Sequence, residues 1–158
     1  MIKAAILTIS DSCSQGKHED ISGQTINDIL KENKFQICDK NIFPDEQEKI
    51  TAQLIRLSDI VRVDVVFTIG GTGLGPRDVT PEATIAVCQK LVPGLGELMR
   101  SKGLEKTPNA TLSRSVAGIR NNTLIINLPG SPKAVRECLE MILNILPHAV
   151  KMLHGGGH

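Results

Sequence analysis

Chemically versatile residues follow four of the segments that the sequence predicts to be strands. After the first of these strands come residues 10–12, SDS, and after the second come residues 44–46, PDE. The third strand is followed by the glycine-rich segment 70–78 and the last by residues 129–133. In an open parallel sheet, ligands bind at the carboxyl ends of the strands, because the strand-to-helix loops converge there. We therefore expect three aspartates, two glycine-bearing loops and two basic residues to gather at one edge of the sheet.

The glycine-rich segment 70–78, GGTGLGPRD, matches neither common nucleotide-binding signature. A dinucleotide fingerprint begun at Gly71 needs glycine at position 76, where Pro76 stands, and a P-loop needs Lys before Ser or Thr at that point. The glycines still leave backbone without Cβ atoms, which can direct N–H groups at an anion or lie against a ring. A ligand cradle and a tight turn are the two interpretations.

Two aspartates differ in how readily a structural role explains them. Asp45 and Glu48 form D-x-x-E, a variant of the capping box, so capping of the next helix is the first explanation for Asp45. Asp78 has no such role, because Thr80 is expected to cap the helix that follows it. The structural roles left for Asp78 are a place in a turn or an ion pair with Arg77.

For two further charged residues, Asp11 and Lys133, the sequence allows either a structural or a functional role. Asp11 fits an Asx turn. Lys133 falls in the first turn of its expected helix, where a cation opposes the helix dipole, and a phosphate bound there would offset that conflict. Otherwise Lys133 extends into water. The four histidines show no ligand spacing and no serine lies in a G-x-S-x-G turn, so neither a histidine metal site nor a hydrolase is indicated.

The elements that would position these residues alternate between strands and helices. Strands are expected at residues 3–9, 35–43 and 63–69. Ser22 is expected to cap the first helix, and a short helix is expected around residues 97–101.

Near the carboxyl end, residues 115–119 and 123–128 flank a turn and predict an antiparallel hairpin, and Ser131 is expected to cap a last helix. The order predicts an α/β fold, a three-layer α/β/α sandwich with a mostly parallel sheet and one antiparallel hairpin.

Length, composition and charge limit the classes of function. The 158 residues suit one domain, residues 1–158. Lys and Arg total 18 against 17 for Asp and Glu, and there is no Trp or Tyr, so the chain lacks both the basic surface and the stacking rings of nucleic-acid binders. No apolar run approaches the roughly 18–20 residues of a membrane span. Four scattered cysteines indicate reduced, mostly buried thiols and a cytoplasmic protein.

Several motifs together resemble the MogA/MoaB family, which includes the molybdopterin adenylyltransferases. They are GGTGLGPRDVTPEAT at residues 70–84, PDE at 44–46, LSRS at 112–115 and NLPGSP at 127–132. The match runs in order from about Ile6 to about Lys151. The chain lacks the longer C-terminal part of some bacterial adenylyltransferases, so the MogA and MoaB branches are not distinguished.

The resemblance implies a reaction. Such enzymes take molybdopterin and ATP with Mg²⁺, transfer AMP to the terminal phosphate of the pterin and release pyrophosphate. It also implies a homotrimer, and it makes the enzyme of the later molybdate insertion a candidate partner. A non-catalytic molybdopterin-binding paralogue or scaffold of the same fold is the alternative.

The resemblance also assigns roles to residues. Asp45 and Asp78 become catalytic residues and Mg²⁺ ligands, which reverses the preference for capping at Asp45. Ser10 and Asp11, with Asp45, are expected near the nucleotide. The pterin and its phosphate are expected against a larger set: Gly70, Gly71, Thr72, Gly73, Ser113, Arg114, Pro129, Gly130, Ser131 and Lys133.

Overall fold

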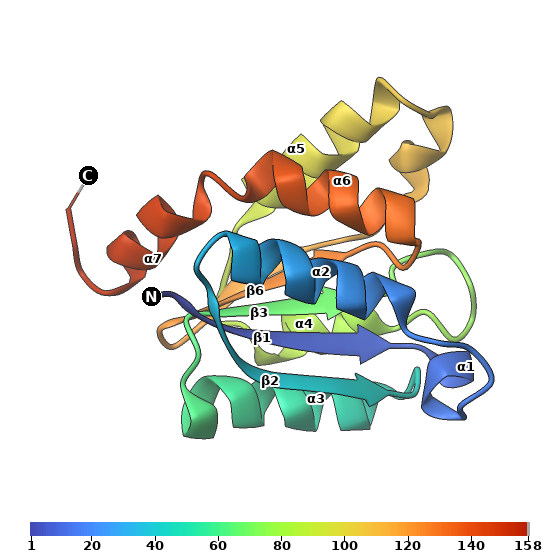
Figure 1. Cartoon of the computed structure of the whole chain (residues 1–158), viewed down its shortest axis with the longest axis horizontal. Coiled ribbons are helices and arrows are strands. Elements are labelled where there is room, and N and C mark those ends of the chain that lie inside the picture. Colours follow the sequence, from blue (N-terminus) through green and yellow to red (C-terminus); the bar gives the residue numbers. More distant parts are fainter. Residues whose placement is uncertain (158) are drawn as a thin grey trace.

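The computed structural model describes residues 1–157, and within them the strands form one six-stranded sheet in the order β2-β1-β3-β6-β5-β4 (Figure 1). The strands are β1 (Lys3–Ile9), β2 (Gln36–Phe43), β3 (Val65–Ile69), β4 (Lys90–Leu91), β5 (Ala117–Arg120) and β6 (Thr123–Leu128). Strands β2, β1, β3 and β6 are parallel, whereas β5 runs antiparallel to both of its neighbours. The predicted mostly parallel sheet and the β5–β6 hairpin are confirmed.

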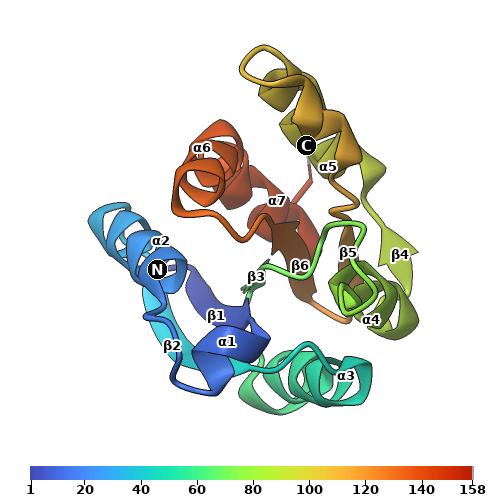
Figure 2. The same cartoon turned by 90° about the vertical axis from the view of Figure 1, so that its right-hand side faces the viewer.

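Helices cover both faces of this sheet. They are α1 (Asp11–Ser14), α2 (Ile21–Glu32), α3 (Gln47–Ile55), α4 (Thr80–Val87), α5 (Pro93–Leu104), α6 (Pro132–Ile142) and α7 (Leu146–Leu153). A π-helical turn, η1 (Arg56–Val61), continues α3, and a 3₁₀ turn, η2 (Pro108–Leu112), follows α5. Figures 1 and 2 show α2, α5 and α6 on one face and α3 and α4 on the other, so the predicted three-layer sandwich is confirmed.

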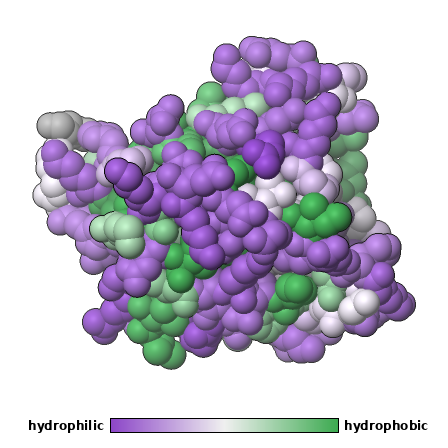
Figure 3. Space-filling model, in the orientation of Figure 1, coloured by the Kyte–Doolittle hydropathy of each residue, from purple (hydrophilic) through white to green (hydrophobic). Residues whose placement is uncertain are grey.

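Two apolar cores separate the layers. Along β1, Ala4 and Ile6 face the core under α2 and α6, whereas Ala5 and Leu7 face the core under α3 and α4. Every residue of β3 is buried, as expected of a central strand covered on both faces. The outer surface over α2 and α6 is mostly hydrophilic (Figure 3). Among residues 1–157, no helix has both the length and the apolar character needed to cross a membrane.

A buried polar network crosses the second of these cores at Asn127 of β6. The Asn127 amide donates 2.9 Å hydrogen bonds to the hydroxyls of Thr68 on β3 and Thr84 on α4. Its carbonyl oxygen accepts from the Val116 N–H at 3.2 Å. All three side chains of the network have no exposed area, so these hydrogen bonds replace those that water would otherwise make.

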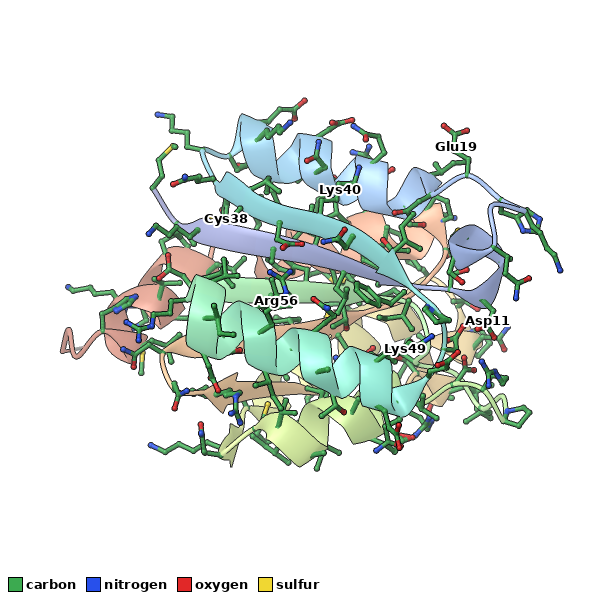
Figure 4. All side chains as sticks on the ribbon, turned by 90° about the horizontal axis from the view of Figure 1, so that it is seen from below. Asp11, Glu19, Cys38, Lys40, Lys49 and Arg56 are labelled. Atoms are coloured by element: carbon green, nitrogen blue, oxygen red, sulfur yellow. The ribbon has the colours of Figure 1, made fainter. Side chains whose placement is uncertain are left out.

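The path of the chain places the loops of interest at one end of the sheet. From β1 the chain turns outward to the edge strand β2, and then returns to β3 on the other side of β1. The strand order therefore reverses between β1 and β3, and a crevice opens at the carboxyl ends of two such strands. Figure 4 shows Asp11 at that end of β1, with Cys38 and Arg56 toward the opposite end.

Some helix starts differ from the expectation. The N-cap of α2 is Asp20, whose carboxylate accepts from the Gly23 N–H at 2.8 Å. The expected cap, Ser22, lies inside α2, and its hydroxyl donates to the Gly130 carbonyl at 2.7 Å. Ser131 does cap α6, as predicted, by accepting from the Ala134 N–H.

Thr80 does not cap α4 with its side chain. The helix begins at Thr80 itself, and its backbone N–H donates to the Gly71 carbonyl at 3.1 Å. The Gly71 carbonyl thus satisfies one of the first N–H groups of α4, which have no acceptor within the helix. The Thr80 hydroxyl is fully buried and has no hydrogen-bond partner among residues 1–157.

Two further elements extend the prediction. The helix expected at residues 97–101 runs from Pro93 to Leu104, because Pro93 favours the first turn although Gly94 and Gly96 weaken the helical pattern. The two-residue strand β4 is too short to leave a pattern.

The four cysteines are free thiols, as predicted, but they are less buried than expected. Cys38 is exposed and the other three are partly buried. Burial raises the pKa of Cys88 and that of Cys138 to about 11, so both stay protonated at neutral pH.

An ion pair joins the π-helical turn to the hairpin. The Asp59 carboxylate accepts from Arg120 Nε at 3.0 Å and from Arg120 Nη2 at 2.6 Å, and it also accepts from the Asn121 amide at 2.7 Å. The hydrogen bonds from Arg120 lower the pKa of Asp59.

We expect Asp59→Asn to lower the melting temperature at neutral pH. A carboxyl whose pKa is depressed on folding stabilises the protein above its unfolded pKa, about 4 for Asp, and this stabilisation is lost as the pH falls through the lower folded pKa. The difference in melting temperature between wild type and variant should therefore become smaller when the melts are repeated at pH values from about 7 down to about 2. A difference that stays constant over this range would contradict the role of the ion pair.

Candidate functional site

A cavity of about 350 Å³ opens at the carboxyl ends of β1 and β3. Residues from four separate loops line it, as the topology predicts for a strand-order reversal. Six of the residues predicted for the site are among them: Ser10, Asp45, Gly70, Gly71, Asp78 and Gly130. We refer to this space as the carboxylate cavity.

Backbone packing beside the carboxylate cavity requires glycine at two positions. Gly70 and Gly71 have φ of +96° and +67°, a region that L side chains rarely adopt. A Cβ at Gly70 would lie 2.4 Å from the Ile9 carbonyl oxygen. A Cβ at Gly71 would lie 2.2 Å from the Thr80 hydroxyl and 3.2 Å from Asp45 Oδ1. The segment is therefore a tight turn whose bare Cα atoms also keep the space beside Asp45 open.

Asp45 does not cap α3. The helix begins at Gln47 after Glu46, so Glu48 is one position too early to complete a capping box. Instead, Asp45 Oδ2 accepts from the Asp11 N–H at 2.9 Å, and the Asp45 N–H donates to Asp11 Oδ1 at 3.0 Å. The ends of β1 and β2 are thereby joined by two reciprocal hydrogen bonds.

The electrostatic surroundings shift the pKa values of Asp45 and Asp11 in opposite directions. Burial raises the pKa of Asp45, and the negative charges of Asp11 and Asp78 raise it further, against the Asp11 N–H hydrogen bond. The pKa of Asp11 is lowered, chiefly by its hydrogen bonds to Arg77. Asp45 is thus a partly buried acid whose charged form gains from an added cation.

Asp78 lies over the glycine-rich segment. Its Oδ2 accepts from the Gly75 N–H at 3.0 Å, and the same oxygen is 2.9 Å from the position of a Cβ at Gly73. Neither of the two expected roles, a turn alone or a pair with Arg77, describes it fully, because Asp78 also lines the carboxylate cavity while Arg77 pairs with Asp11.

Arg114 holds this segment from the other side. Its Nε donates to the Gly73 carbonyl and its Nη2 to the Asp78 carbonyl, both at 2.8 Å. Its Nη1 donates to both carboxylate oxygens of Glu82, at 2.6 and 3.0 Å. The guanidinium therefore fixes the loop that carries Asp78.

A second cavity, of about 320 Å³, shares the glycine-rich segment with the first. Its lining is more apolar and includes four other predicted residues: Thr72, Gly73, Ser113 and Pro129. Arg100 and Glu137 also line it and were missed from the sequence. For Glu137 the sequence did hold a signal, because one face of the last predicted helix lines this cavity. The residues of that face follow the spacing i, i+3, i+4, i+7 and are Ala134, Glu137, Cys138 and Met141.

The remaining predicted residues lie next to the cavities without lining either. Ser131 caps α6, Lys133 is exposed in its first turn, and Asp11 and Arg114 are held in the contacts described above. In the part of the chain that the structure describes, no cluster of three or more His, Cys, Asp or Glu side chains is arranged to hold a metal ion.

Comparisons with known proteins agree with this arrangement. A family described as "Probable molybdopterin binding domain" matches residues 5–148. A molybdopterin adenylyltransferase of Helicobacter pylori strain J99 is 47% identical over 156 residues, covering 98% of this chain and 89% of the relative. The molybdopterin adenylyltransferase of Escherichia coli K12 is 38% identical, covering 94% of this chain and 80% of the relative.

The fold comparison gives the same result. A crystal structure of the molybdopterin biosynthesis enzyme MoaB from Thermus thermophilus superposes with a TM-score of 0.93 at 47% identity, covering 98% of both chains. A MogA structure superposes with a TM-score of 0.91 at 37% identity, covering 96% of this chain and 99% of the other. The resemblance predicted from the motifs is confirmed. The chain belongs to the molybdopterin-binding family that contains the MogA and MoaB proteins.

Proposed function

We propose that this protein is a molybdopterin adenylyltransferase of molybdenum cofactor biosynthesis, acting as a single domain. The observation that carries the proposal is the placement of Asp45 and Asp78 in one cavity, beside glycine backbone at the reversal of strand order. Two curated relatives with the same name, at 47% and 38% identity, support it.

The proposed reaction joins two phosphate groups. An oxygen of the terminal phosphate of molybdopterin attacks the α-phosphorus of ATP and forms a new P–O–P bridge. The bond from the α-phosphorus to the oxygen that it shares with the β-phosphorus breaks, and pyrophosphate leaves with that electron pair. Both reactants are anionic, so the protein must align them in line and offset their repulsion.

The two cavities suit two different substrates. We place the nucleotide in the carboxylate cavity, near Ser10 and Asp45. The pterin ring then lies toward the second, more apolar cavity, against Thr72 and Ser113, and the reacting phosphates meet beside the glycine-rich segment that the two cavities share. Lys133, exposed at the start of α6, is positioned to attract a phosphate near Gly130.

Asp45 and Asp78 fit a Mg²⁺ ion. Mg²⁺ is usually held by one or two carboxylates together with substrate phosphates and water, so two carboxylates are enough for such a site. The raised pKa of Asp45 and the orphaned, buried Thr80 hydroxyl beside Gly71 mark a place where added positive charge and polar partners are favoured. When bound, Mg²⁺ supplies charge neutralisation at the phosphates.

The test is direct. Purified protein incubated with molybdopterin and Mg-ATP should form adenylylated pterin and pyrophosphate in equal amounts. Omitting Mg²⁺ should stop both. Tight pterin binding without either product would instead support the non-catalytic molybdopterin-binding paralogue or scaffold.

Family resemblance also leads us to propose a cytoplasmic homotrimer whose product passes to the enzyme of molybdate insertion. Light scattering at several concentrations should give a mass three times that of the 17.1 kDa chain. A monomer at micromolar protein would contradict the trimer.

A further inference from the structure

The carboxylate of Asp11 is occupied by protein groups on both of its oxygens. Oδ1 accepts from the Asp45 N–H at 3.0 Å and from Arg77 Nη2 at 3.0 Å. Oδ2 accepts from Arg77 Nε at 3.0 Å. A carboxylate held by a guanidinium fork has its orientation set more closely than one held by a single bond. These contacts differ from those expected of a residue that binds substrate directly.

Asp11 joins three strand ends that form the carboxylate cavity. It follows β1, its partner Asp45 follows β2, and Arg77 lies in the loop after β3, next to Asp78 in sequence. The Asp11 N–H also donates to Asp45 Oδ2 at 2.9 Å, so Asp45 is held at both its backbone and its carboxylate. Ser10 N–H donates to the Phe43 carbonyl at 2.9 Å and extends the β1–β2 pairing up to this point.

We propose that the side chain of Asp11 has a positioning role in adenylyl transfer: it holds the backbone N–H of Asp45, and so the place from which the Asp45 carboxylate projects, and through Arg77 it ties the loop of Asp78 to the end of β1. The inference rests on the proposed function of Asp45 and Asp78. Asp11 acts through Asp45 and contacts neither ATP nor the pterin. The geometry of the two carboxylates then depends on a contact between loops that are 66 residues apart in the chain.

The experiment compares Asp11→Ala with Asp11→Asn. The alanine removes both the acceptor for the Asp45 N–H and the partner of Arg77, whereas the asparagine oxygen can still accept from the Asp45 N–H. We expect Asp11→Ala to lower kcat by about 10²-fold, the loss that a misplacement of about 1 Å can cause, with the KM for molybdopterin unchanged. Asp11→Asn should retain clearly more activity than Asp11→Ala. If the two lose kcat equally, the negative charge and not the orientation matters, and the proposal fails.

Double substitution tests whether Asp11 acts through Asp45. Once Asp45→Asn has removed the charged group, adding Asp11→Ala should lower kcat little further, because residues that act as a unit are not additive. Losses that multiply would overturn the proposal. A raised KM for ATP at unchanged kcat would also overturn it, since that pattern marks a direct substrate contact.

A binding measurement separates this inference from the proposed function. Affinity for Mn²⁺ with a non-hydrolysable ATP analogue, followed by electron paramagnetic resonance, should fall in Asp11→Ala and much less in Asp11→Asn. Unchanged Mn²⁺ affinity in Asp11→Ala overturns the positioning role, even if wild-type protein makes no adenylylated pterin. Absence of product with wild-type protein overturns the enzyme, while the Mn²⁺ titration still decides the role of Asp11.

Asp59→Asn is the matched control. Asp59 is held by the same fork of Nε and Nη2, from Arg120, but in the turn η1 that lies outside both cavities. This variant should lose stability while its kcat and Mn²⁺ affinity at a temperature below melting remain those of wild type. An equal loss of kcat in Asp59→Asn would mean that Asp11 contributes only stability.

Discussion

Asp45→Asn should lower the kcat of adenylyl transfer by at least about 10²-fold while leaving the melting temperature nearly unchanged. Asparagine keeps the size of the side chain and an oxygen that can accept from the Asp11 N–H. It removes the negative charge that would hold Mg²⁺ among the phosphates, and loss of such a group typically costs at least about 10²-fold in kcat. Because Asp45 does not cap α3, no helix is weakened. Product formation and thermal melts of the same preparation measure both effects.

Asp78→Asn and Asp45→Ala complete this comparison. Asp78→Asn should lose transfer in the same way. Its amide keeps the hydrogen bond from the Gly75 N–H only when the amide oxygen, and not the nitrogen, faces that N–H. Asp45→Ala should be less stable than Asp45→Asn, because it leaves the Asp11 N–H without its acceptor. Wild-type turnover in Asp45→Asn would leave Asp78 as the sole catalytic carboxylate of the proposal.

Gly71→Ala should damage both stability and activity. Its φ of +67° costs an alanine about 1–2 kcal/mol, and the new Cβ would lie 2.2 Å from the buried Thr80 hydroxyl. Relief of that contact requires the start of α4 to move away from the glycine-rich segment, and Asp45 Oδ1 lies 3.2 Å from the same Cβ. We expect a melting temperature lower by roughly 2–8 °C, with transfer lost even at temperatures where the protein stays folded.

Gly94→Ala serves as the control for the loss of a glycine. Gly94 lies in the first turn of α5, its φ is not positive, and no atom would lie within 4 Å of the new Cβ. Alanine favours a helix over glycine by about 1 kcal/mol, so the melting temperature should stay the same or rise. A Gly71→Ala protein as stable as Gly94→Ala would show that the glycine-rich segment tolerates a side chain.

The layers of the fold follow from local patterns, which is why they could be predicted. Continuous apolar runs mark β1 and β3, and the amphipathic spacing of α3 and α6 marks the faces that cover them. Caps were harder to predict, because several polar residues compete near a helix start. Asp20 takes the place expected for Ser22, and α4 has no side-chain cap at all, while the Gly71 carbonyl accepts from the Thr80 N–H.

The candidate site was predictable to the extent that it follows from topology. Parallel strand ends must converge, so Asp45 and Asp78 reach one cavity without any knowledge of side-chain contacts. The contacts of the arginines could not be predicted in this way. Arg114 bonds to carbonyls about 40 residues earlier in the chain, and this pairing depends on how the loops fold over one another.

The buried amide of Asn127 has a consequence for strand alignment. Apolar residues lie on both faces of β6, so hydrophobicity alone would tolerate a slide of two residues against β3. Such a slide would place Ile125 between the hydroxyls of Thr68 and Thr84 and leave both without the amide donor. The cost of those unsatisfied groups makes the slipped alignment unfavourable. Asn127 thus selects one register, and because Gly130 follows β6 by two residues, the same choice fixes the place of that glycine opposite Gly70.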